Sequence, residues 1–425
     1  SYLRRIKMSV KYQSIKGMKD VLPNESPKWI FFERIIIDWM KKYGYEQIRT
    51  PIIENTNLFI RSIGEATDIV EKEMYSFVDS LNKDKLTLRP EGTVACLRAC
   101  LENNLLYNST QRLWYMGPMF RHEKPQKGRY RQFTQVGVEA LGLEGPDIDA
   151  EMITMTKDLW NQLGFKNIEL QVNTLGTVAE RAKYRNILIK YLEDNIDVLD
   201  EDGRRRLYSN PLRVLDSKNK SMQDICNNAP KLIEYLGKDS LCHYYTWLNF
   251  LEKLGISYVE NTRLVRGLDY YNNSVFEWIS YANESPLTFC AGGRYNGLME
   301  ELGGESKAGI GFAMGVERVL DMLDTKVIPE NNNLIYIVHF GNNTDEYGLL
   351  IAQKLRNIGF NVKQDFEHTS IKSQLKRADK YNARFSIIIG ENEVYLNKVK
   401  VKEMKSRNEV LIDLNNLIDF FIKNN

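Results

Sequence analysis

The sequence predicts an α+β protein in which a mainly antiparallel sheet with a helical insertion is followed by a small α/β domain. Its 425 residues exceed what one hydrophobic core usually organises, so we expect more than one domain. Over the first three quarters of the chain, strand-like runs follow one another through short, hairpin-like connections, a pattern typical of antiparallel sheets. From residue 334 onward strands and helices alternate instead, which indicates a separate α/β unit.

The first expected element is an amphipathic helix that begins at Pro27. Apolar residues recur at helical spacing from Trp29 to Met40, and Gly44 ends the pattern. The next run, 45–53, has strand character. Because Pro51 has no amide hydrogen to donate to a ladder, it belongs at a strand end or a sheet edge.

The spacing of apolar residues predicts the remaining elements of the first three quarters. We expect strands at 85–89, 113–121, 131–141, 168–172, 264–268, 274–279 and 287–291. We expect helices around 93–102, 148–163 and 308–323. Between residue 177 and about residue 257 the pattern is helical and rich in charge, without a strong strand signal, so we interpret this segment as a helical insertion.

A polar segment at 325–333 has the composition of a linker, with Pro329 and three consecutive asparagines. It separates a domain at 8–324 from a domain at 334–425. The second domain should hold strands at 334–340, near 362 and at 385–389, helices at 345–358 and 370–381, a hairpin-like pair within 395–412 and a final helix at 414–423.

Composition excludes several classes of protein. With 58 Lys and Arg against 56 Asp and Glu, any binding of nucleic acid must come from local clusters of charge. No apolar run approaches the roughly 18 residues that a membrane span needs. The five cysteines and four histidines form no CxxC or HExxH motif, so we expect no disulfides, no metal held by a protein cage, and the reduced thiols of a cytoplasmic chain. The basic stretch Ser1 to Lys7 is too short for a secretory signal, and we expect Met8 to be the natural start.

The most informative stretch is MFRHEKPQKGRYRQFTQ, residues 119–135, which carries five basic residues against one acid. It predicts a hairpin with a basic loop. A solvated loop would explain the loop charges, but it would not explain Arg121, which we expect at the end of the first strand with its side chain on a sheet face. GxxxxGK[ST], a strand-linked GxGxxG and the kinase motifs are missing, so any use of ATP must rest on other residues.

Two further segments carry unusual residues within an apolar pattern. In LVRGLDYYN, residues 264–272, Arg266 and Asp269 interrupt an expected strand, and a buried charge is costly unless it is paired. In GIGFAMGVERVL, residues 309–320, small residues let a strand and a helix pack closely, with Arg318 on the helix. On its own, this last segment would be read as a glycine-rich packing joint with a surface arginine.

Taken as a set, these motifs make the chain resemble the histidyl-tRNA synthetases, a family of class II aminoacyl-tRNA synthetases. The helix and strand that end at Pro51 are similar to class motif 1, FRHEKPQKGRYRQF to motif 2 and GFAMGVERVL to motif 3. LVRGLDYYN and AGGRYNGL, residues 291–298, are similar to two segments that distinguish the histidine enzymes. The resemblance runs from about Tyr12 to the C-terminus. It implies a class II catalytic domain with a helical insertion and a C-terminal α/β anticodon-binding domain.

The resemblance implies an enzyme, a histidine–tRNA ligase. It would use ATP with Mg²⁺ to activate L-histidine to histidyl-adenylate, and then transfer the histidyl group to the 3′ end of tRNA(His). Charge that builds on phosphate oxygens is stabilised by positioned cations, so arginines are the expected catalysts. Arg121 and Arg266 would hold the α-phosphate from opposite sides and Arg318 the γ-phosphate. The residues that would bind ATP are Arg121, Glu123, Arg129, Phe133 and Arg318.

The same resemblance implies the residues that recognise histidine. Glu91, Gly92 and Thr93 would lie at the ammonium group, Arg121 and Gln135 at the carboxylate, Glu139, Tyr270 and Tyr271 at the imidazole, with Arg266 beside them. A site that forms hydrogen bonds with both ring nitrogens rejects apolar analogues strongly, so we expect no editing activity. Without the resemblance, Glu139 could also be a strand carboxylate paired with a nearby arginine.

The resemblance also implies partners. Lys124, Gln126 and Arg129 in the motif 2 loop would contact the acceptor end of the tRNA, although Lys124 replaces an arginine of many bacterial relatives and cannot bind in a bidentate manner. The last domain carries 14 Lys and Arg against 11 Asp and Glu from residue 334 on, which fits anticodon contacts through bases and phosphates. We expect a cytoplasmic homodimer built on motif 1, without membrane attachment.

Two alternatives differ in class from an aminoacylating enzyme. One is the synthetase-like regulatory subunit of ATP phosphoribosyltransferase, a binding module that usually has altered catalytic arginines and lacks the last domain. The other is a synthetase-like sensor domain of a larger kinase, which the missing kinase motifs disfavour. The chain keeps Arg121, Arg266 and Arg318 together with a complete last domain, which favours the ligase.

Overall fold

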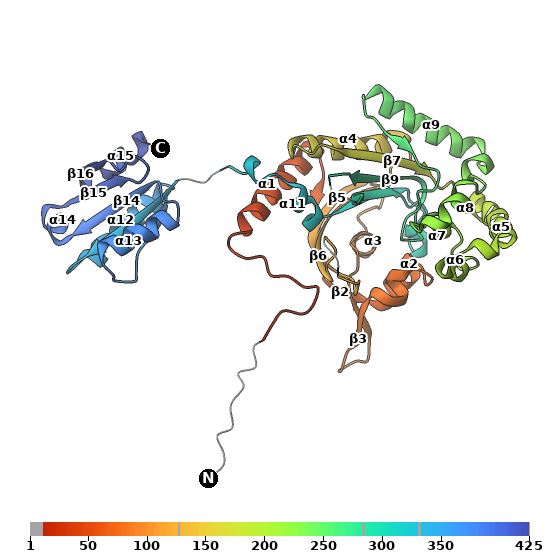
Figure 1. Ribbon diagram of the computed structural model, residues 1–425, viewed down its shortest axis with the longest axis horizontal. Helices are drawn as coiled ribbons and strands as arrows, with labels where there is room; N and C mark the ends of the chain where they lie inside the picture. The colour runs from red at the N-terminus through yellow and green to blue at the C-terminus, as the bar shows by residue number, and fades with distance from the viewer. Residues whose placement is uncertain (1–11, 126–127, 283–284, 330–332, 425) are drawn as a thin grey trace, which may run out of the picture. The chain divides into compact units, whose positions relative to one another are not determined.

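The computed structural model describes residues 12–125, 128–282, 285–329 and 333–424, and the chain divides into two compact units between Val327 and Ile328 (Figure 1). Each unit has its own sheet and its own core. The predicted α+β class is confirmed. The expectations for Met8 and for Gln126 lie outside the described residues.

The first unit is organised by an eight-stranded sheet with the order β1-β5-β6-β11-β10-β9-β7-β8. Neighbouring strands are antiparallel except in the pairs β1·β5 and β7·β8. The strands are β1 (Glu46–Gln47), β5 (Gln111–Phe120), β6 (Gln132–Leu141), β7 (Ile168–Thr174), β8 (Val259–Glu260), β9 (Asn272–Ser280), β10 (Leu287–Arg294) and β11 (Gly309–Gly315). A second, antiparallel sheet joins β2 (Ile53–Asn55), β4 (Lys85–Leu88) and β3 (Tyr75–Val78).

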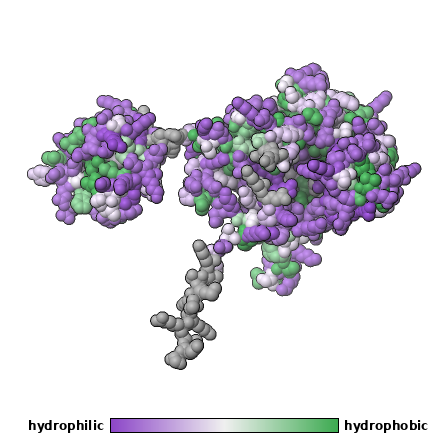
Figure 2. Space-filling model, in the orientation of Figure 1, coloured by the Kyte–Doolittle hydropathy of each residue, from purple (hydrophilic) through white to green (hydrophobic). Residues whose placement is uncertain are grey.

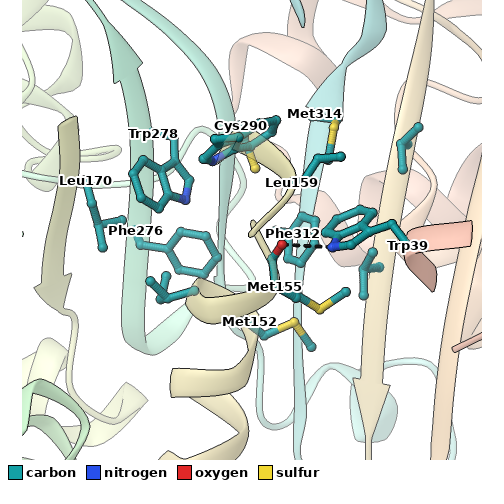
Figure 3. Close-up of a cluster of buried hydrophobic side chains, with 14 of the residues drawn as sticks. Trp39, Met152, Met155, Leu159, Leu170, Phe276, Trp278, Cys290, Phe312 and Met314 are labelled. Carbon is teal, nitrogen blue, oxygen red and sulfur yellow. Dashed lines mark hydrogen bonds between the residues drawn. The ribbon is translucent and has the colours of Figure 1, made fainter. Parts of the chain in front are cut away.

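Helices α1 (Ser26–Lys42) and α4 (Pro146–Gln162) pack on one face of the large sheet and form its main core. Alternate residues of the strands point into this core, among them Val136 and Phe312. The indole nitrogen of Trp39 donates a hydrogen bond of 2.9 Å to the carbonyl of Met155, which ties the two helices together (Figure 3). Large apolar side chains fill most of this face, and the buried pair of Arg294 on β10 and Asp149 on α4 is a polar exception.

The remaining helices of the first unit include the predicted insertion. Thr177 and Glu180 form a capping box that begins its first helix, in which each side chain bonds the backbone amide of the other. The insertion contains α5 (Val178–Asp194), η2 (Ile196–Val198), α6 (Glu201–Arg206), α7 (Leu212–Leu215), η3 (Lys220–Met222), α8 (Gln223–Asn227), η4 (Leu232–Tyr235) and α9 (Lys238–Lys253). The other helices are α2 (Thr56–Ile63), η1 (Ile69–Glu73), α3 (Thr93–Glu102), α10 (Leu298–Glu301), α11 (Val316–Met322) and η5 (Thr325–Val327).

The prediction of a strand at 264–268 is wrong. These residues have no strand conformation, and the backbone of the segment bonds elsewhere: the Leu264 carbonyl accepts from the Asn173 side chain at 2.9 Å, and the Asp269 amide donates to the Ile63 carbonyl at 3.0 Å. The segment is therefore held by single contacts from two different elements. This irregular path carries Arg266 to a position that a ladder would not give it.

The prediction of a helix at 308–323 is correct only for its second half. Residues Gly309–Gly315 form strand β11, which pairs with β6 on one side and β10 on the other, and only Val316–Met322 are helical. Glycine and alanine fit both spacings, so the apolar pattern alone could not distinguish a central strand from a helix.

Two smaller differences between prediction and structure concern the limits of strands. The run 45–53 is divided at Pro51, since β1 pairs in the large sheet and β2 in the small one. Arg121 lies one residue beyond the end of β5, where its amide donates to the Arg131 carbonyl at 2.9 Å, so it closes the hairpin and does not stand in the strand.

The second unit has a five-stranded mixed sheet with the order β13-β12-β14-β15-β16, in which β12 is parallel to β13 and β14. Helices α12 and α15 pack on one face and α13 on the other. The expected hairpin begins later than predicted, since Tyr395 belongs to α14. The elements are β12 (Leu334–Phe340), α12 (Thr344–Asn357), β13 (Asn361–Gln364), α13 (Ile371–Lys380), β14 (Phe385–Gly390), α14 (Glu391–Leu396), β15 (Lys398–Glu403), β16 (Glu409–Asp413), η6 (Leu414–Asn416) and α15 (Leu417–Lys423).

Figure 2 shows a mainly hydrophilic surface with scattered apolar residues, the usual composition of a protein exterior. Apolar side chains gather on the hairpin of β3 and β4, where Val78 and Leu81 are exposed. Within the described ranges, no helix is both long and apolar enough to cross a membrane.

Candidate active site

A cavity of about 240 Å³, open to solvent, lies on the face of the eight-stranded sheet opposite the main core. Its walls come from segments far apart in the sequence: the end of β5 and the start of β6, β10, β11, the irregular segment around residue 268, and the first turn of α11. The predicted residues that line it are Glu91, Thr93, Arg121, Glu123, Arg129, Phe133, Gln135, Arg266, Tyr270, Tyr271 and Arg318.

The alternation of residues along β6 and β11 makes room for this cavity. Val136 and Phe312 point into the core, so their neighbours Gln135 and Gly311 face the other side. A Cβ atom at Gly311 would lie 2.1 Å from the Glu139 Oε2 atom, and one at Gly137 would lie 2.1 Å from the Tyr115 ring. Glycine at these positions therefore lets a carboxylate and an aromatic ring lie directly on the backbone of the sheet.

Three guanidinium groups converge on the cavity. Arg121 donates to the Pro90 carbonyl at 2.8 Å, with its guanidinium 5.2 Å from the centre of the Phe133 ring. Arg266 donates to Glu277 Oε1 at 2.6 Å, with its guanidinium 5.4 Å from the centre of the Tyr271 ring. Segments that are more than 100 residues apart in the sequence thus place cations around one space.

Arg318 is held by backbone atoms only, as far as the described contacts go. Its Nε donates to the Gly128 carbonyl at 2.9 Å and its Nη1 to the Thr288 carbonyl at 2.6 Å. Burial lowers the pKa of Arg318, and the nearby guanidinium groups of Arg129 and Arg121 lower it further. Cations that repel one another in a partly buried space are stabilised when an anion enters, so this end of the cavity suits a polyphosphate.

The opposite end of the cavity is acidic and hydroxyl-rich. Glu91 accepts the backbone amides of Thr93 at 2.8 Å and Val94 at 3.0 Å, which places its carboxylate at the N-terminus of α3. The Tyr270 hydroxyl also donates to Glu91, at 3.3 Å. Burial raises the pKa of Glu91, partly offset by these amides.

Glu139 lies behind this end, with only 1% of its surface exposed, and it is not part of the cavity lining. Its carboxylate accepts hydrogen bonds from the hydroxyls of Thr93 at 2.7 Å, Tyr115 at 3.0 Å and Tyr295. Burial raises the pKa of Glu139 to about 8, although these hydroxyl donors favour the ionised form. Among the described residues, no arginine forms a hydrogen bond with Glu139. The alternative in which Glu139 is a strand carboxylate paired with an arginine is therefore not seen there.

Two polar atoms at the cavity have no partner among the described residues. The Oε1 atom of Gln135 and the Nε atom of Arg266 are both buried and unpaired. A buried polar group without a hydrogen bond is costly, and both residues line the cavity. These atoms are therefore available to a bound substrate.

The basic loop after β5 is partly tied down. Arg129 lies 3.6 Å from Glu123, and the Arg131 Nε donates to the Glu123 carbonyl at 3.2 Å. Lys124 is exposed and does not line the cavity, and Gly92 also lies outside the lining. Next to Arg318, Glu317 accepts the Thr134 amide at 2.8 and 3.0 Å, and burial raises the pKa of Glu317 to about 7.

Sequence reasoning missed four residues of this region: Tyr115, Tyr295, Glu277 and Thr288. Tyr295 stands within AGGRYNGL, a segment similar to the histidine enzymes, so its place in that motif was a signal in the sequence. Tyr115, Glu277 and Thr288 stand in ordinary strand patterns. Their hydrogen bonds appear only in the folded sheet: Tyr115 with Glu139, Glu277 with Arg266, and Thr288 with Glu277.

Comparisons with known proteins agree with the geometry. A family model for histidyl-tRNA synthetase matches residues 17–319, and a model for an anticodon binding domain matches residues 327–424. The chain is 57% identical over 405 residues to a histidine–tRNA ligase of Laribacter hongkongensis, covering 95% of this chain and 96% of that protein. The solved structure of apo S. aureus histidyl-tRNA synthetase is similar with a TM-score of 0.81 at 36% identity, covering 97% of this chain and 100% of that one. An ATP phosphoribosyltransferase regulatory subunit/histidyl-tRNA synthetase from Bacillus halodurans shares the fold at 20% identity and a TM-score of 0.62, covering 89% of this chain and 98% of that one.

Proposed function

Because the chain belongs to the histidyl-tRNA synthetase family, we propose that the cavity of its first unit binds histidine and ATP side by side. The chain is a histidine–tRNA ligase, which activates L-histidine with ATP to histidyl-adenylate and transfers the histidyl group to the 3′ end of tRNA(His). One observation carries the assignment of the cavity: three guanidinium groups share its lining with Glu91, Thr93 and Tyr270, which belong to a buried, hydroxyl-rich acidic cluster.

ATP lies at the cationic end in this proposal. The histidine carboxylate attacks the α-phosphorus in line, and pyrophosphate leaves, so negative charge builds on the phosphate oxygens. Arg121 and Arg266 stabilise the α-phosphate from two sides and Arg318 binds the γ-phosphate, while Glu123, Arg129 and Phe133 complete the nucleotide site. A guanidinium about 4 Å from a phosphate oxygen contributes roughly 4 kcal/mol at an effective dielectric constant of 20, so each arginine is expected to matter.

Histidine lies at the acidic end. Its ammonium group binds Glu91 and Thr93 beside Gly92, and its carboxylate accepts from Arg121 and from the side-chain amide nitrogen of Gln135, both of which line the cavity. The imidazole packs against Tyr270 and Tyr271, with Arg266 at the junction with the nucleotide. Glu139 lies behind Thr93, outside the cavity lining, and acts on the imidazole through the Thr93 hydroxyl, which donates to its carboxylate. Tyr115 and Tyr295 hold Glu139 in place, because both hydroxyls donate to its carboxylate.

Mg²⁺ would accompany the pyrophosphate part of ATP. The carboxylates Glu123 and Glu317 line the cavity next to the arginines and offer the oxygen ligands that Mg²⁺ prefers, with the phosphates supplying further ligands. An ion held there would supply positive charge beside the leaving pyrophosphate. The residues of the chain orient the nucleotide and stabilise the α-phosphate.

The tRNA is proposed to bind at both units. In the first unit, Lys124, Gln126 and Arg129 contact the acceptor end, and in the second unit the anticodon-binding domain contacts the anticodon. The proposed domain limits are 8–324 with an insertion at about 177–257, a linker at 325–333, and 334–425. A cytoplasmic location follows from the role in protein synthesis.

We also propose a homodimer built on motif 1. Helix α1 buries Phe32 and Trp39, yet Ile30 and Ile37 on the same helix are 47% and 42% exposed. Apolar residues left exposed on a helix are expected at an interface between copies. Light scattering of the purified chain tests this, and a fully active monomer would contradict it.

The activity is tested by histidine-dependent exchange of pyrophosphate into ATP, followed by charging of tRNA(His), with the purified chain. Exchange that requires histidine and is absent with other amino acids is the expected result. Binding of histidine without exchange would favour the regulatory-subunit alternative. The 57% identity over 95% of the chain to a histidine–tRNA ligase argues against that alternative.

A further inference from the structure

We propose that Glu277 and Thr288 are positioning residues that hold Arg266 and Arg318 at a fixed spacing across the floor of the cavity. Neither residue was expected from the sequence motifs. The inference deepens the proposed function, because it rests on the roles given to Arg266 and Arg318 in binding the triphosphate.

The four residues form a continuous chain of hydrogen bonds. Arg266 Nη1 donates to Glu277 Oε1 at 2.6 Å, and the Thr288 hydroxyl donates to Glu277 Oε2 at 3.0 Å. Arg318 Nη1 donates to the backbone carbonyl of Thr288 at 2.6 Å. One carboxylate therefore fixes the first guanidinium directly and the second through a single residue of the neighbouring strand.

A β-bulge makes this arrangement possible. In the ladder of β9 and β10, Ala291 lies opposite Glu277 and Thr288 lies opposite Ile279, with a register shift between Thr288 and Cys290. Residues 288 and 291 are three apart, so in a regular strand their side chains would face opposite sides. The extra residue at 289 turns Thr288 to the side of Glu277, in the way that bulges re-aim side chains beside functional sites.

We call the chain of hydrogen bonds from Arg266 through Glu277 and Thr288 to Arg318 the bridge. Charge and burial make this bridge rigid. The side chains of Arg266 and Glu277 are only 16% and 17% exposed, and a partly buried charge pair with a short hydrogen bond resists separation. Arg318 is held by the carbonyls of Gly128 and Thr288, so the position of the Thr288 backbone sets the position of its guanidinium. Glu91 and Thr93, which bind histidine in our proposal, lie on other elements and take no part in the bridge.

The bridge should therefore affect the rate of adenylate formation more than the binding of histidine. Two conservative variants of the full chain test this: Thr288→Val removes the hydroxyl with little change of shape, and Glu277→Gln removes the charge. Thr288→Ser keeps the hydroxyl and serves as the rescue. Glu169→Gln on β7 is the matched control, because Glu169 is also a strand carboxylate with two side-chain donors. Its donors, Gln171 and Tyr281, lie outside the cavity lining, whereas Arg266 and Thr288 belong to it.

The measurement is the kcat of histidine-dependent pyrophosphate exchange, the KM values for histidine and ATP, and the melting temperature. We expect Thr288→Val and Glu277→Gln to lower kcat about 10- to 100-fold, as small displacements of catalytic groups do, with the histidine KM changed by about twofold or less. Thr288→Ser should recover most of the rate, and Glu169→Gln should match the parent. In an Arg266→Ala background, Glu277→Gln should lower kcat by a smaller factor than it does alone, because only the path to Arg318 through Thr288 is left to lose.

The outcomes separate the bridge from the proposed function. If Arg266→Ala leaves kcat unchanged, the role given to that arginine is wrong and the bridge falls with it. If Arg266→Ala is slow while Thr288→Val keeps the parent rate, the bridge alone is wrong. Loss of histidine affinity in proportion to rate, or failure of Thr288→Ser to restore the rate lost in Thr288→Val, would also overturn it. A Glu277→Gln chain that fails to fold is set aside, and the Thr288 pair then decides.

Discussion

The two faces of the eight-stranded sheet use the same strands for opposite purposes. On one face, Val136 and Phe312 pack under α1 and α4 in a dry apolar core (Figure 3). On the other, the adjacent Gln135 and Ala313 border a cavity lined by carboxylates and guanidinium groups. Since strand residues alternate between faces, one short segment contributes to stability with every second residue and to chemistry with the others. Substitutions at adjacent positions should therefore have different effects: those on the core face should lower stability, and those on the cavity face should lower the rate of the reaction.

The largest expected effect is on the core face. Phe312→Ala should lower the free energy of unfolding by about 3–5 kcal/mol, because it leaves a cavity between the sheet and the helices. Urea unfolding followed by tryptophan fluorescence reports this, since all six tryptophans lie in the first unit. Leu254→Ala, at a residue 53% exposed, should stay within about 0.5 kcal/mol. A loss below about 1 kcal/mol for Phe312→Ala would show that this face is not the main core.

The next effect, on the cavity face, should appear in rate. Arg266→Ala should lower adenylate formation by at least about 100-fold and leave histidine binding nearly intact, because it removes a charge that acts on the phosphate. Arg112→Ala is the control: like Arg266, Arg112 is paired with a glutamate, Glu151 at 2.6 Å, but it lies outside the cavity lining. Rapid-quench assays and calorimetry measure the two quantities. Equal losses of histidine affinity and rate would contradict the role.

The third expected effect, on the cavity side of the sheet, is a pH dependence of stability that comes from Glu139. Burial raises the pKa of Glu139 to about 8, whereas in the unfolded chain its ordinary value is 4.5. Between these values the folded chain binds more protons than the unfolded chain, so this residue makes stability fall as pH rises from about 4.5 through about 8. The slope cannot exceed about 1.4 kcal/mol per pH unit for one proton. Glu139→Gln should reduce the slope measured by urea unfolding, and Glu169→Gln should not; identical slopes in all three chains would reject a shifted pKa at Glu139.

The smallest effect is expected at the rim of the cavity. Lys124 is exposed, so Lys124→Ala should lower kcat/KM for tRNA charging by only about two- to fivefold, and less at higher salt, because a solvated contact with phosphate is screened. Pyrophosphate exchange, which needs no tRNA, should keep its rate. A loss of exchange would place Lys124 at the nucleotide instead.

The C-terminal unit and the helix at 93–102 were readily predicted because their signals are local. The run LIYIVHF occupies β12 as expected, and α3 has the predicted limits. The motif arginines could also be named from the sequence, since their neighbours Glu123, Tyr270 and Glu317 stand in short contiguous patterns that carry the family resemblance. Periodicity and short motifs are properties of neighbouring residues, so the sequence alone could determine them.

Tertiary structure decided the features that depend on pairing between distant segments. Whether 309–315 is a strand or a helix depends on β6 and β10 on either side, and whether Arg266 lies in a ladder depends on contacts with residues 63 and 173. The bulge that brings Thr288 to Glu277 likewise exists only in the aligned sheet. The physical reason is that backbone hydrogen bonds and buried charges are satisfied by long-range partners, which no local pattern specifies.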